Sequence, residues 1–124
     1  MIIISWKDDI VESLKFGLVD MFVLFLLSEE DMYGYQIKKE IEKRTNGVFI
    51  MKEGTLYGPL YRMEERKFIS SRKVPAGARY RNYYHLEDIG REYLCFIIKS
   101  YNEITNSTKY FLDWGKANGK QTNQ

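Results

Sequence analysis

Four polar side chains at the start of one segment are placed to bond to another molecule. They are Thr55, Tyr57, Tyr61 and Arg62, within the stretch EGTLYGPLYRMEERKF at residues 53–68. Leu56, Leu60 and Met63 are spaced to line the buried face of a helix, so the four polar side chains fall outside that face. Hydroxyl and guanidinium groups in such a position can bond to phosphates or base edges. Packing against the fold is the alternative for either tyrosine.

Residues typical of catalysis or metal binding form no pattern in this sequence. There is no Ser/His/Asp constellation, Gly-rich phosphate loop or paired-carboxylate arrangement. His85 is the only histidine and Cys95 the only cysteine, so neither a metal-ligand spacing nor an internal disulfide exists. We therefore expect no enzyme activity and no cofactor. The cysteine count also favours a reducing compartment, here the cytoplasm.

Positive charge is concentrated in the middle of the chain. Residues 1–31 carry two basic and seven acidic side chains, residues 32–81 carry twelve and five, and residues 82–124 carry five of each. The basic block favours an anionic partner, such as nucleic acid or a membrane surface. It spreads over several elements rather than one amphipathic helix, which favours DNA and argues against a peripheral membrane protein. The apolar run at residues 16–27 is too short to span a bilayer and is expected to be a core helix.

The pattern of apolar and turn residues predicts four helices and a hairpin. The expected helices cover residues 10–28 (capped by Asp8 or Asp9), residues 35–45, a third segment beginning near Pro59, and residues 88–114. The residues VFIM, 48–51, are a candidate short strand. Two β-type runs, 68–74 and 80–86, are joined by the five residues PAGAR. Residues 115–124 are polar and are expected to be disordered.

This order of elements is that of a winged helix-turn-helix. The expected fold class is mainly α with a small β-hairpin (α+β), with residues 1–87 as the DNA-binding domain and residues 88–114 as a dimerisation helix. In such modules the third helix enters the major groove and the hairpin follows the phosphate backbone. The residues expected to contact double-stranded DNA are Tyr35, Lys38, Thr55, Tyr57, Tyr61, Arg62, Lys73, Arg79 and Arg81.

The last predicted helix carries a long apolar stripe at three- and four-residue spacing and would be roughly 39 Å long. One small domain cannot cover such a stripe, so we expect a two-fold symmetric homodimer. Cys95 lies near the stripe and is expected to be a buried thiol. The many aromatic residues suggest a pocket for a small planar aromatic effector, with Trp6, Phe96 and Trp114 as candidates. Packing of the two tryptophans at the interface is an equal alternative.

Three segments resemble signature segments of the PadR family of bacterial transcriptional regulators. They are LLSEEDMYGYQIKKEI, GTLYGPLYRMEERKFI and RNYYHLEDIG, and the resemblance covers roughly residues 14–98. It implies a homodimeric winged-helix repressor on a palindromic operator, with the last and first helices building the dimer interface. In some relatives a small aromatic or phenolic molecule, or a planar drug, releases the DNA. Asp20 matches an acidic position of that family and is expected to bond a neighbouring helix or the partner subunit.

The sequence departs from that family pattern at several positions. The family usually has Pro where Gly58 stands, with Pro59 here one residue later, and Gly where Lys67 stands. Glu87 replaces the usual Thr after the second wing strand, and Asn82 replaces a common basic residue within it. These departures concern the fine specificity of DNA reading rather than the DNA-binding face. A winged-helix protein-interaction module without DNA binding is the alternative function.

Overall fold

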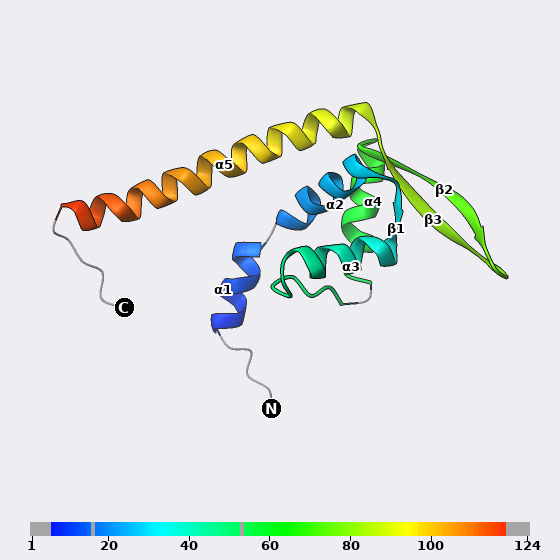
Figure 1. Ribbon diagram of the computed structural model, residues 1–124, viewed down its shortest axis with the longest axis horizontal. Coiled ribbons are helices and arrows are strands. Elements are labelled where there is room, and N and C mark those ends of the chain that lie inside the picture. Colours follow the sequence, from blue (N-terminus) through cyan, green and yellow to red (C-terminus); the bar gives the residue numbers. More distant parts are fainter. Residues whose placement is uncertain (1–5, 16, 53, 119–124) are drawn as a thin grey trace. The chain divides into compact units, whose positions relative to one another are not determined.

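The computed structural model describes residues 6–15, 17–52 and 54–118, with only the backbone of Trp6. The helices are α1 (Trp6–Lys15), α2 (Leu18–Glu29), α3 (Gly34–Arg44), α4 (Tyr57–Glu65) and α5 (Asp88–Ala117), and the strands are β1 (Met32–Tyr33), β2 (Ile69–Ala76) and β3 (Arg79–Leu86). Figure 1 shows α2, α3 and α4 gathered beside β1, with the β2–β3 hairpin extending from them. The winged helix-turn-helix predicted from the sequence is confirmed.

The chain divides into two compact units, residues 1–94 and residues 95–124. The first unit contains the whole winged helix-turn-helix, and its core is made by the buried faces of α2, β1, α3, α4 and the hairpin. Fully or nearly fully buried side chains come from α2 (Val23, Leu24, Leu26, Leu27), α3 (Ile37, Ile41), α4 (Leu60, Met63) and the base of the hairpin (Ile69, Tyr84, Leu86). Each such apolar side chain stabilises the fold by about 1.5–3 kcal/mol.

The single first helix expected over residues 10–28 is wrong, because two helices stand there. Gly17 has a positive φ of 87° and separates α1 from α2. A left-handed residue cannot continue a right-handed helix, and glycine adopts that conformation at little cost. The apolar pattern runs on across this point, so periodicity alone does not reveal the break. The break gives α1 its own axis beside the core helix α2.

The sheet has three strands in the order β1-β3-β2, with both pairs antiparallel. The strand expected at residues 48–51 is wrong, since that segment has no regular structure, although Phe49 and Met51 are buried. The third strand is instead β1, whose two residues pair with Tyr84 and Tyr83. A strand of two residues forms only because a neighbouring strand pairs with it. It is too short to show an alternating pattern of apolar and polar residues in the sequence.

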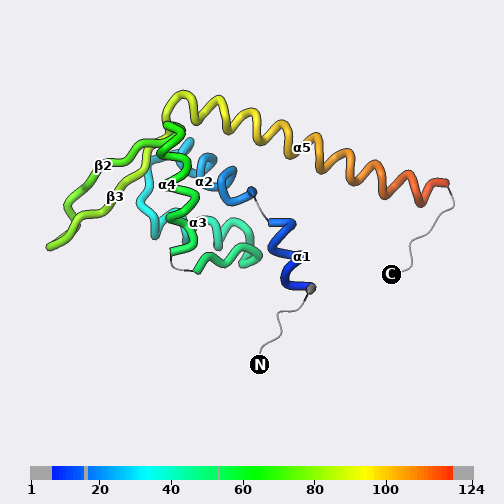
Figure 2. Tube along the Cα trace, turned by 180° about the vertical axis from the view of Figure 1, so that it is seen from behind, coloured from blue at the N-terminus to red at the C-terminus, as the bar shows by residue number. Residues whose placement is uncertain are grey.

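The hairpin is longer than the sequence indicated, and its turn is shorter. The strands run to Ala76 and from Arg79, so only Gly77 and Ala78 remain between them in place of the five-residue PAGAR loop. Gly77 has a φ of 65°, as a tight hairpin turn requires. Pro75 lies inside β2 and pairs with Tyr80. A proline is tolerated there because β2 is an edge strand and has a free side. The resulting wing is the long two-stranded ribbon of Figure 2.

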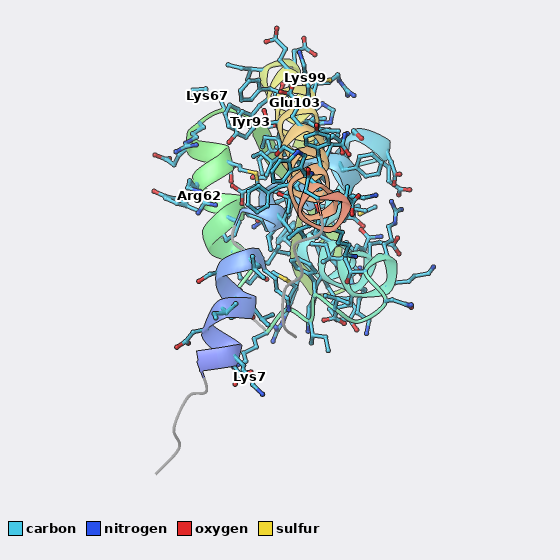
Figure 3. All side chains as sticks on the ribbon, turned by 90° about the vertical axis from the view of Figure 1, so that its left-hand side faces the viewer. Lys7, Arg62, Lys67, Tyr93, Lys99 and Glu103 are labelled. Atoms are coloured by element: carbon cyan, nitrogen blue, oxygen red, sulfur yellow. The ribbon has the colours of Figure 1, made fainter. Side chains whose placement is uncertain are left out.

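Helices α3 and α4 both end in the same hydrogen-bonded turn. After α3, Gly47 donates to the carbonyl of Glu42 and Asn46 to that of Lys43, with positive φ at Asn46 and Gly47. After α4, Phe68 donates to Met63 and Lys67 to Glu64. Lys67 has a φ of 64° and lies at the C-terminal end of α4 (Figure 3). A side chain in this conformation costs about 1–2 kcal/mol compared with glycine.

Helix α5 runs to Ala117, three residues beyond the end expected from its apolar stripe. Residues 115–117, assigned to a disordered tail from the sequence, are therefore helical, and residues 119–124 lie outside the described residues. The prediction that Cys95 is buried is wrong: the thiol is exposed. Cys95 lies on the opposite side of the helix from Ile104 and Phe111. Within the described residues, no helix is both long and apolar enough to cross a membrane.

Gly90 is required where α5 begins, which gives a stability prediction. A Cβ atom at this position would lie 2.1 Å from the carbonyl oxygen of Phe68 and 2.9 Å from Leu86 Cδ1. We expect Gly90→Ala to lower the free energy of unfolding by about 1–3 kcal/mol or more, because backbone atoms must move. Urea unfolding followed by circular dichroism measures the change.

Gly115→Ala is the matched control on the same helix. A Cβ there meets no heavy atom within 4 Å, and alanine is the better helix former by up to about 1 kcal/mol. This variant should be as stable as the parent or more stable. Equal stability of the two alanine variants would contradict the packing shown at Gly90.

Candidate nucleic-acid interface

A shallow groove lies where the start of α3 meets the start of α4. Its volume is about 220 Å³, and it is lined by Gly34, Tyr35, Lys38, Lys52, Gly54, Leu56 and Tyr57. Three residues predicted to contact DNA, Tyr35, Lys38 and Tyr57, are therefore brought together. Both helices begin beside the groove, so their free N–H groups add partial positive charge. Among the described lining residues there are two cations and no carboxylate, which suits a phosphate group.

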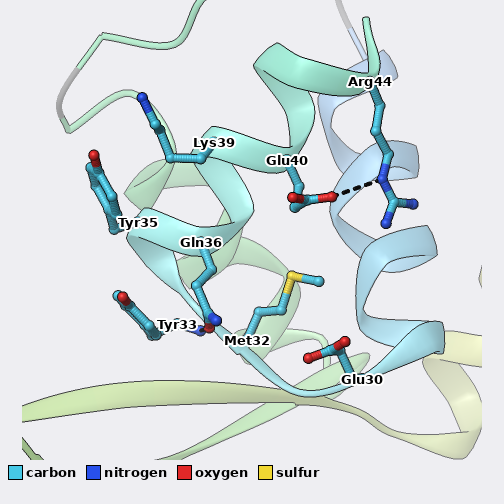
Figure 4. Close-up of a pocket in the computed structure, with 8 residues that line it drawn as sticks. All are labelled: Glu30, Met32, Tyr33, Tyr35, Gln36, Lys39, Glu40 and Arg44. Atoms are coloured by element: carbon cyan, nitrogen blue, oxygen red, sulfur yellow. Dashed lines mark hydrogen bonds and ion pairs between the residues drawn. The ribbon is translucent and has the colours of Figure 1, made fainter.

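A second pocket lies along the outer face of α3 and has a different character. It measures about 370 Å³ and includes Tyr35 and Lys39, but also Glu30, Glu40 and Arg44 (Figure 4). Arg44 is already occupied, since it donates to Glu40 at 3.0 Å and to both oxygens of Glu29. The hydrogen bond from Arg44 also lowers the pKa of Glu29. The two carboxylates in this pocket make it a poor place for a phosphate.

Arg62 and Thr55 belong to a third hollow, on the other side of α4. This hollow measures about 280 Å³ and lies between α1, α2, the segment after α3 and the start of α4. Within it, Nη2 of Arg62 donates to both carboxylate oxygens of Asp20, at 2.8 and 2.9 Å. The prediction that Asp20 bonds a neighbouring helix is confirmed. Thr55, which precedes α4, and Tyr57, the first residue of α4, thus line different hollows.

The outward face of α4 lies between these two hollows. Leu60 and Met63 are buried, and helical geometry places Gly58 on the opposite side. No heavy atom lies within 4 Å of a Cβ built on Gly58, so the helix surface is open there. Tyr61 is 68% exposed beside it. This side of α4 offers the close approach that a helix needs in a DNA groove.

The wing presents its cations on two faces. Side chains alternate between the faces of a strand. The register Ala76↔Arg79, Val74↔Arg81 and Lys73↔Asn82 therefore places Arg79 and Arg81 on one face and Lys73 on the other. The guanidinium of Arg81 lies 4.4 Å from the ring centre of Tyr33, a cation–π contact. Arg79 and Lys73 are both exposed.

Comparison with known proteins adds to this geometry. The model of the "Transcriptional regulator PadR-like family" matches residues 23–95, which include α3, α4 and the wing. The chain belongs to the PadR family. It is also 35% identical over 109 residues to an uncharacterised protein of Lysinibacillus sphaericus, covering 86% of this chain and 95% of that one.

Solved structures of the family have the same fold. A transcriptional regulator from Clostridium thermocellum is 30% identical, covering 81% of this chain and 98% of that one, with a TM-score of 0.75. A PadR family regulator from Clostridium difficile is 31% identical, covering 77% and 99%, with a TM-score of 0.69. A PadR-like regulator from Bacillus cereus is 27% identical, covering 81% and 96%, with a TM-score of 0.70. This PadR-family chain is a transcriptional regulator and not an enzyme.

Asp31 ties the wing of this PadR protein to the segment before β1. Its carboxylate accepts a hydrogen bond from Arg72 Nη1 on β2 at 2.6 Å and lies 2.8 Å from His85 Nδ1 on β3. Partial burial by itself would raise the pKa of Asp31, but the hydrogen bonds to His85 and Arg72 outweigh it and hold that pKa below its usual value. Arg72 also lies over the ring of Tyr83. One carboxylate thus holds both wing strands.

The lowered pKa of Asp31 predicts how the PadR wing responds to acid. A carboxyl group whose pKa is lowered by folding stabilises the folded state at pH values above its ordinary pKa. This stabilisation is lost as the pH falls through the pKa that the group has in the folded state. At pH 7 we expect Asp31→Asn to be less stable than the parent by up to about 1 kcal/mol, since the partners are half-exposed. That gap should close as the pH falls below the ordinary aspartate pKa of about 3.9.

Urea unfolding of both proteins across this pH range tests the Asp31 prediction. Ser13→Ala, a substitution of an exposed residue of α1, serves as the control and should show no pH-dependent gap. A difference between Asp31→Asn and the parent that stays constant, or widens, as the pH falls below about 3.9 would show that the carboxylate charge is not the stabilising feature.

Two residues of this PadR interface are missing from the sequence prediction. Lys52 lines the groove with Lys38, but it stands outside any helix, and only its place in the basic middle block pointed to it. Asp31 had no local signal, because its partners are 41 and 54 residues away.

The effector candidates are not brought together: Phe96 and Trp114 are both exposed and roughly 27 Å apart along α5, and the side chain of Trp6 lies outside the described residues.

Proposed function

We propose that this PadR-family regulator is a sequence-specific repressor that binds an inverted-repeat operator as a homodimer. One observation carries the proposal: the groove of Lys38 and Lys52, whose described lining holds no carboxylate, adjoins the start of α4, the helix whose outer face is open at Gly58. A phosphate bound in that groove would direct the N-terminal half of α4 into the major groove. The wing cations Lys73 and Arg79 would then neutralise neighbouring phosphates.

The apolar surface of α5 supports the dimer. Phe96, Ile104, Phe111 and Trp114 are all more than half exposed, as is Leu14 of α1, and Ile10 of α1 is 50% exposed. Monomeric proteins rarely expose so long an apolar stripe. A second copy of the chain offers the same stripe in return, as a two-fold interface requires. We assign residues 1–87 to DNA binding and α5 to this interface.

The dimer also accommodates an aromatic effector in one specific way. Phe96 and Trp114 lie on the same side of α5, about five turns apart. If two α5 helices cross antiparallel, Phe96 of one protomer comes near Trp114 of its partner. A planar aromatic bound there would release DNA only if it prefers a dimer shape with the wrong half-site spacing.

Selection of bound sites from a random duplex pool tests the proposed function. We expect enrichment of an inverted repeat whose half-sites are about one helical turn apart. A pool that stays random after repeated selection would favour the alternative, a winged-helix module that binds protein rather than DNA.

A further inference from the structure

Helix α4 is held on both of its flanks by side-chain contacts to other elements. On one flank Arg62 bonds Asp20 of α2. On the other flank, Glu64 accepts a hydrogen bond from Ser71 of β2 at 2.7 Å. The buried residues Leu60 and Met63 anchor the helix in the close-packed core. The two polar contacts lie on either side of this anchor, so they further restrict rotation of α4 and help to set the angle at which its outer face is presented.

The guanidinium of Arg62 is already bonded to a carboxylate, unlike that of an arginine whose side chain is free to bond to a base. A single nitrogen, Nη2, bonds both oxygens of Asp20, and in the described part of the chain Asp20 has no other partner. The Asp20 side chain is 18% exposed and that of Arg62 is 48% exposed. If Arg62 left to reach a base, this largely covered carboxylate would lose its hydrogen bonds. It would also repel the phosphates of the approaching DNA.

We infer that Arg62 is a positioning residue, which fixes the recognition helix α4 through Asp20 and does not itself read a base. This inference rests on the proposed function. The Asp20–Arg62 pair neutralises a carboxylate near the DNA-binding face and locks the rotation of α4 relative to α2. Direct contact with base edges is left to the open side of the helix around Tyr61 and Gly58. The sequence alone had placed Arg62 among the DNA contacts.

The inference is tested with Asp20→Ala, Arg62→Ala and the double variant, using the site that the parent protein selects. Both single variants should lower the ratio of affinities for the selected and scrambled duplexes by a similar factor, about tenfold, and the double variant should be no worse than either single one. The dependence of affinity on salt should be unchanged in Arg62→Ala, because no phosphate contact is lost.

Arg62→Lys and Arg66→Ala are the matched controls. One ammonium nitrogen can replace Nη2 between the two oxygens, so lysine should restore the preference, whereas a bidentate base contact would not be restored by lysine. Arg66 is an exposed cation directly after the end of α4, and removing it should leave the sequence preference unchanged. Amide hydrogen exchange without DNA should be faster in α4 for Asp20→Ala and Arg62→Ala only.

Each possible result either supports or overturns the positioning role of Arg62. A normal preference in Asp20→Ala, with a changed preference and a weaker salt dependence in Arg62→Ala, would show direct contact and overturn the inference. Unchanged exchange of the α4 amides in both alanine variants would also overturn it, even for a variant too weak to bind DNA. If the parent protein selects no sequence, the proposed function fails and the inference fails with it. If the parent selects a site, only the variants decide.

Discussion

The affinity of this protein for duplex DNA is expected to fall by about 10³–10⁵-fold when the salt concentration is raised from 50 to 200 mM. The reason is the number of cations that a dimer would place against phosphates. Lys38 and Lys52 line the groove beside α4, and Lys73 and Arg79 lie on the wing. Four cations from each protomer make about eight contacts, and each releases close to one counterion. Fluorescence anisotropy with a labelled duplex measures the slope.

Single substitutions refine this prediction. Arg79→Ala and Lys52→Ala should each weaken binding to all sequences alike and reduce the slope by about two, because the dimer loses two contacts. Lys109→Ala, on α5, which is assigned to the dimer rather than to DNA binding, is the matched control and should leave the slope unchanged. A slope near zero in the parent protein would mean that the basic middle block does not meet phosphate.

A glutamate at Ile104 is expected to separate the dimer and to lower the affinity for the full inverted repeat by about 10²–10⁴-fold. Ile104 is 65% exposed and lies on the same face of α5 as Phe111, which is 75% exposed. An unpaired carboxylate there would be buried by the partner at a cost of several kcal/mol. Sedimentation at micromolar concentration should show a dimer for the parent and a monomer for Ile104→Glu.

The control for the dimer prediction is Asn106→Glu. It adds the same charge on the opposite side of α5, two residues away, and should remain a dimer with normal affinity. Binding to a single half-site should be equal in Ile104→Glu and the parent, since the DNA-binding residues are untouched. A parent protein that sediments as a monomer would remove the basis for an inverted-repeat operator.

Much of the fold could be predicted from the sequence, since its main signals are local. Asn46-Gly47 marked the end of α3, and Pro59 marked the start of α4 near Tyr57. The errors lie where structure depends on a distant partner. The strand β1 exists only through its pairing with β3. Pro75 looked like a loop residue, and only the position of β2 at the sheet edge allows it within a strand.

The candidate site also contains residues whose role could be predicted from local sequence and one whose partner could not. Tyr35, Lys38 and Tyr57 could be named as contact residues because their types and their places in the basic block were visible, and the structure brings them to one groove. Arg62 shares those properties, yet its guanidinium is bound to a carboxylate 42 residues earlier in the chain. A long-range pair of this kind leaves no spacing in the sequence. The type of a side chain therefore predicted its capacity to bond, but not its partner.

The central claim is that the groove beside α4, the open face of that helix and the wing together recognise a DNA sequence. The most direct measurement compares two labelled duplexes of equal length at physiological salt: the inverted repeat obtained by selection and a scrambled version of the same composition. We predict that the repeat binds at least about 10³-fold more tightly. Equal affinity for the two duplexes would contradict the claim.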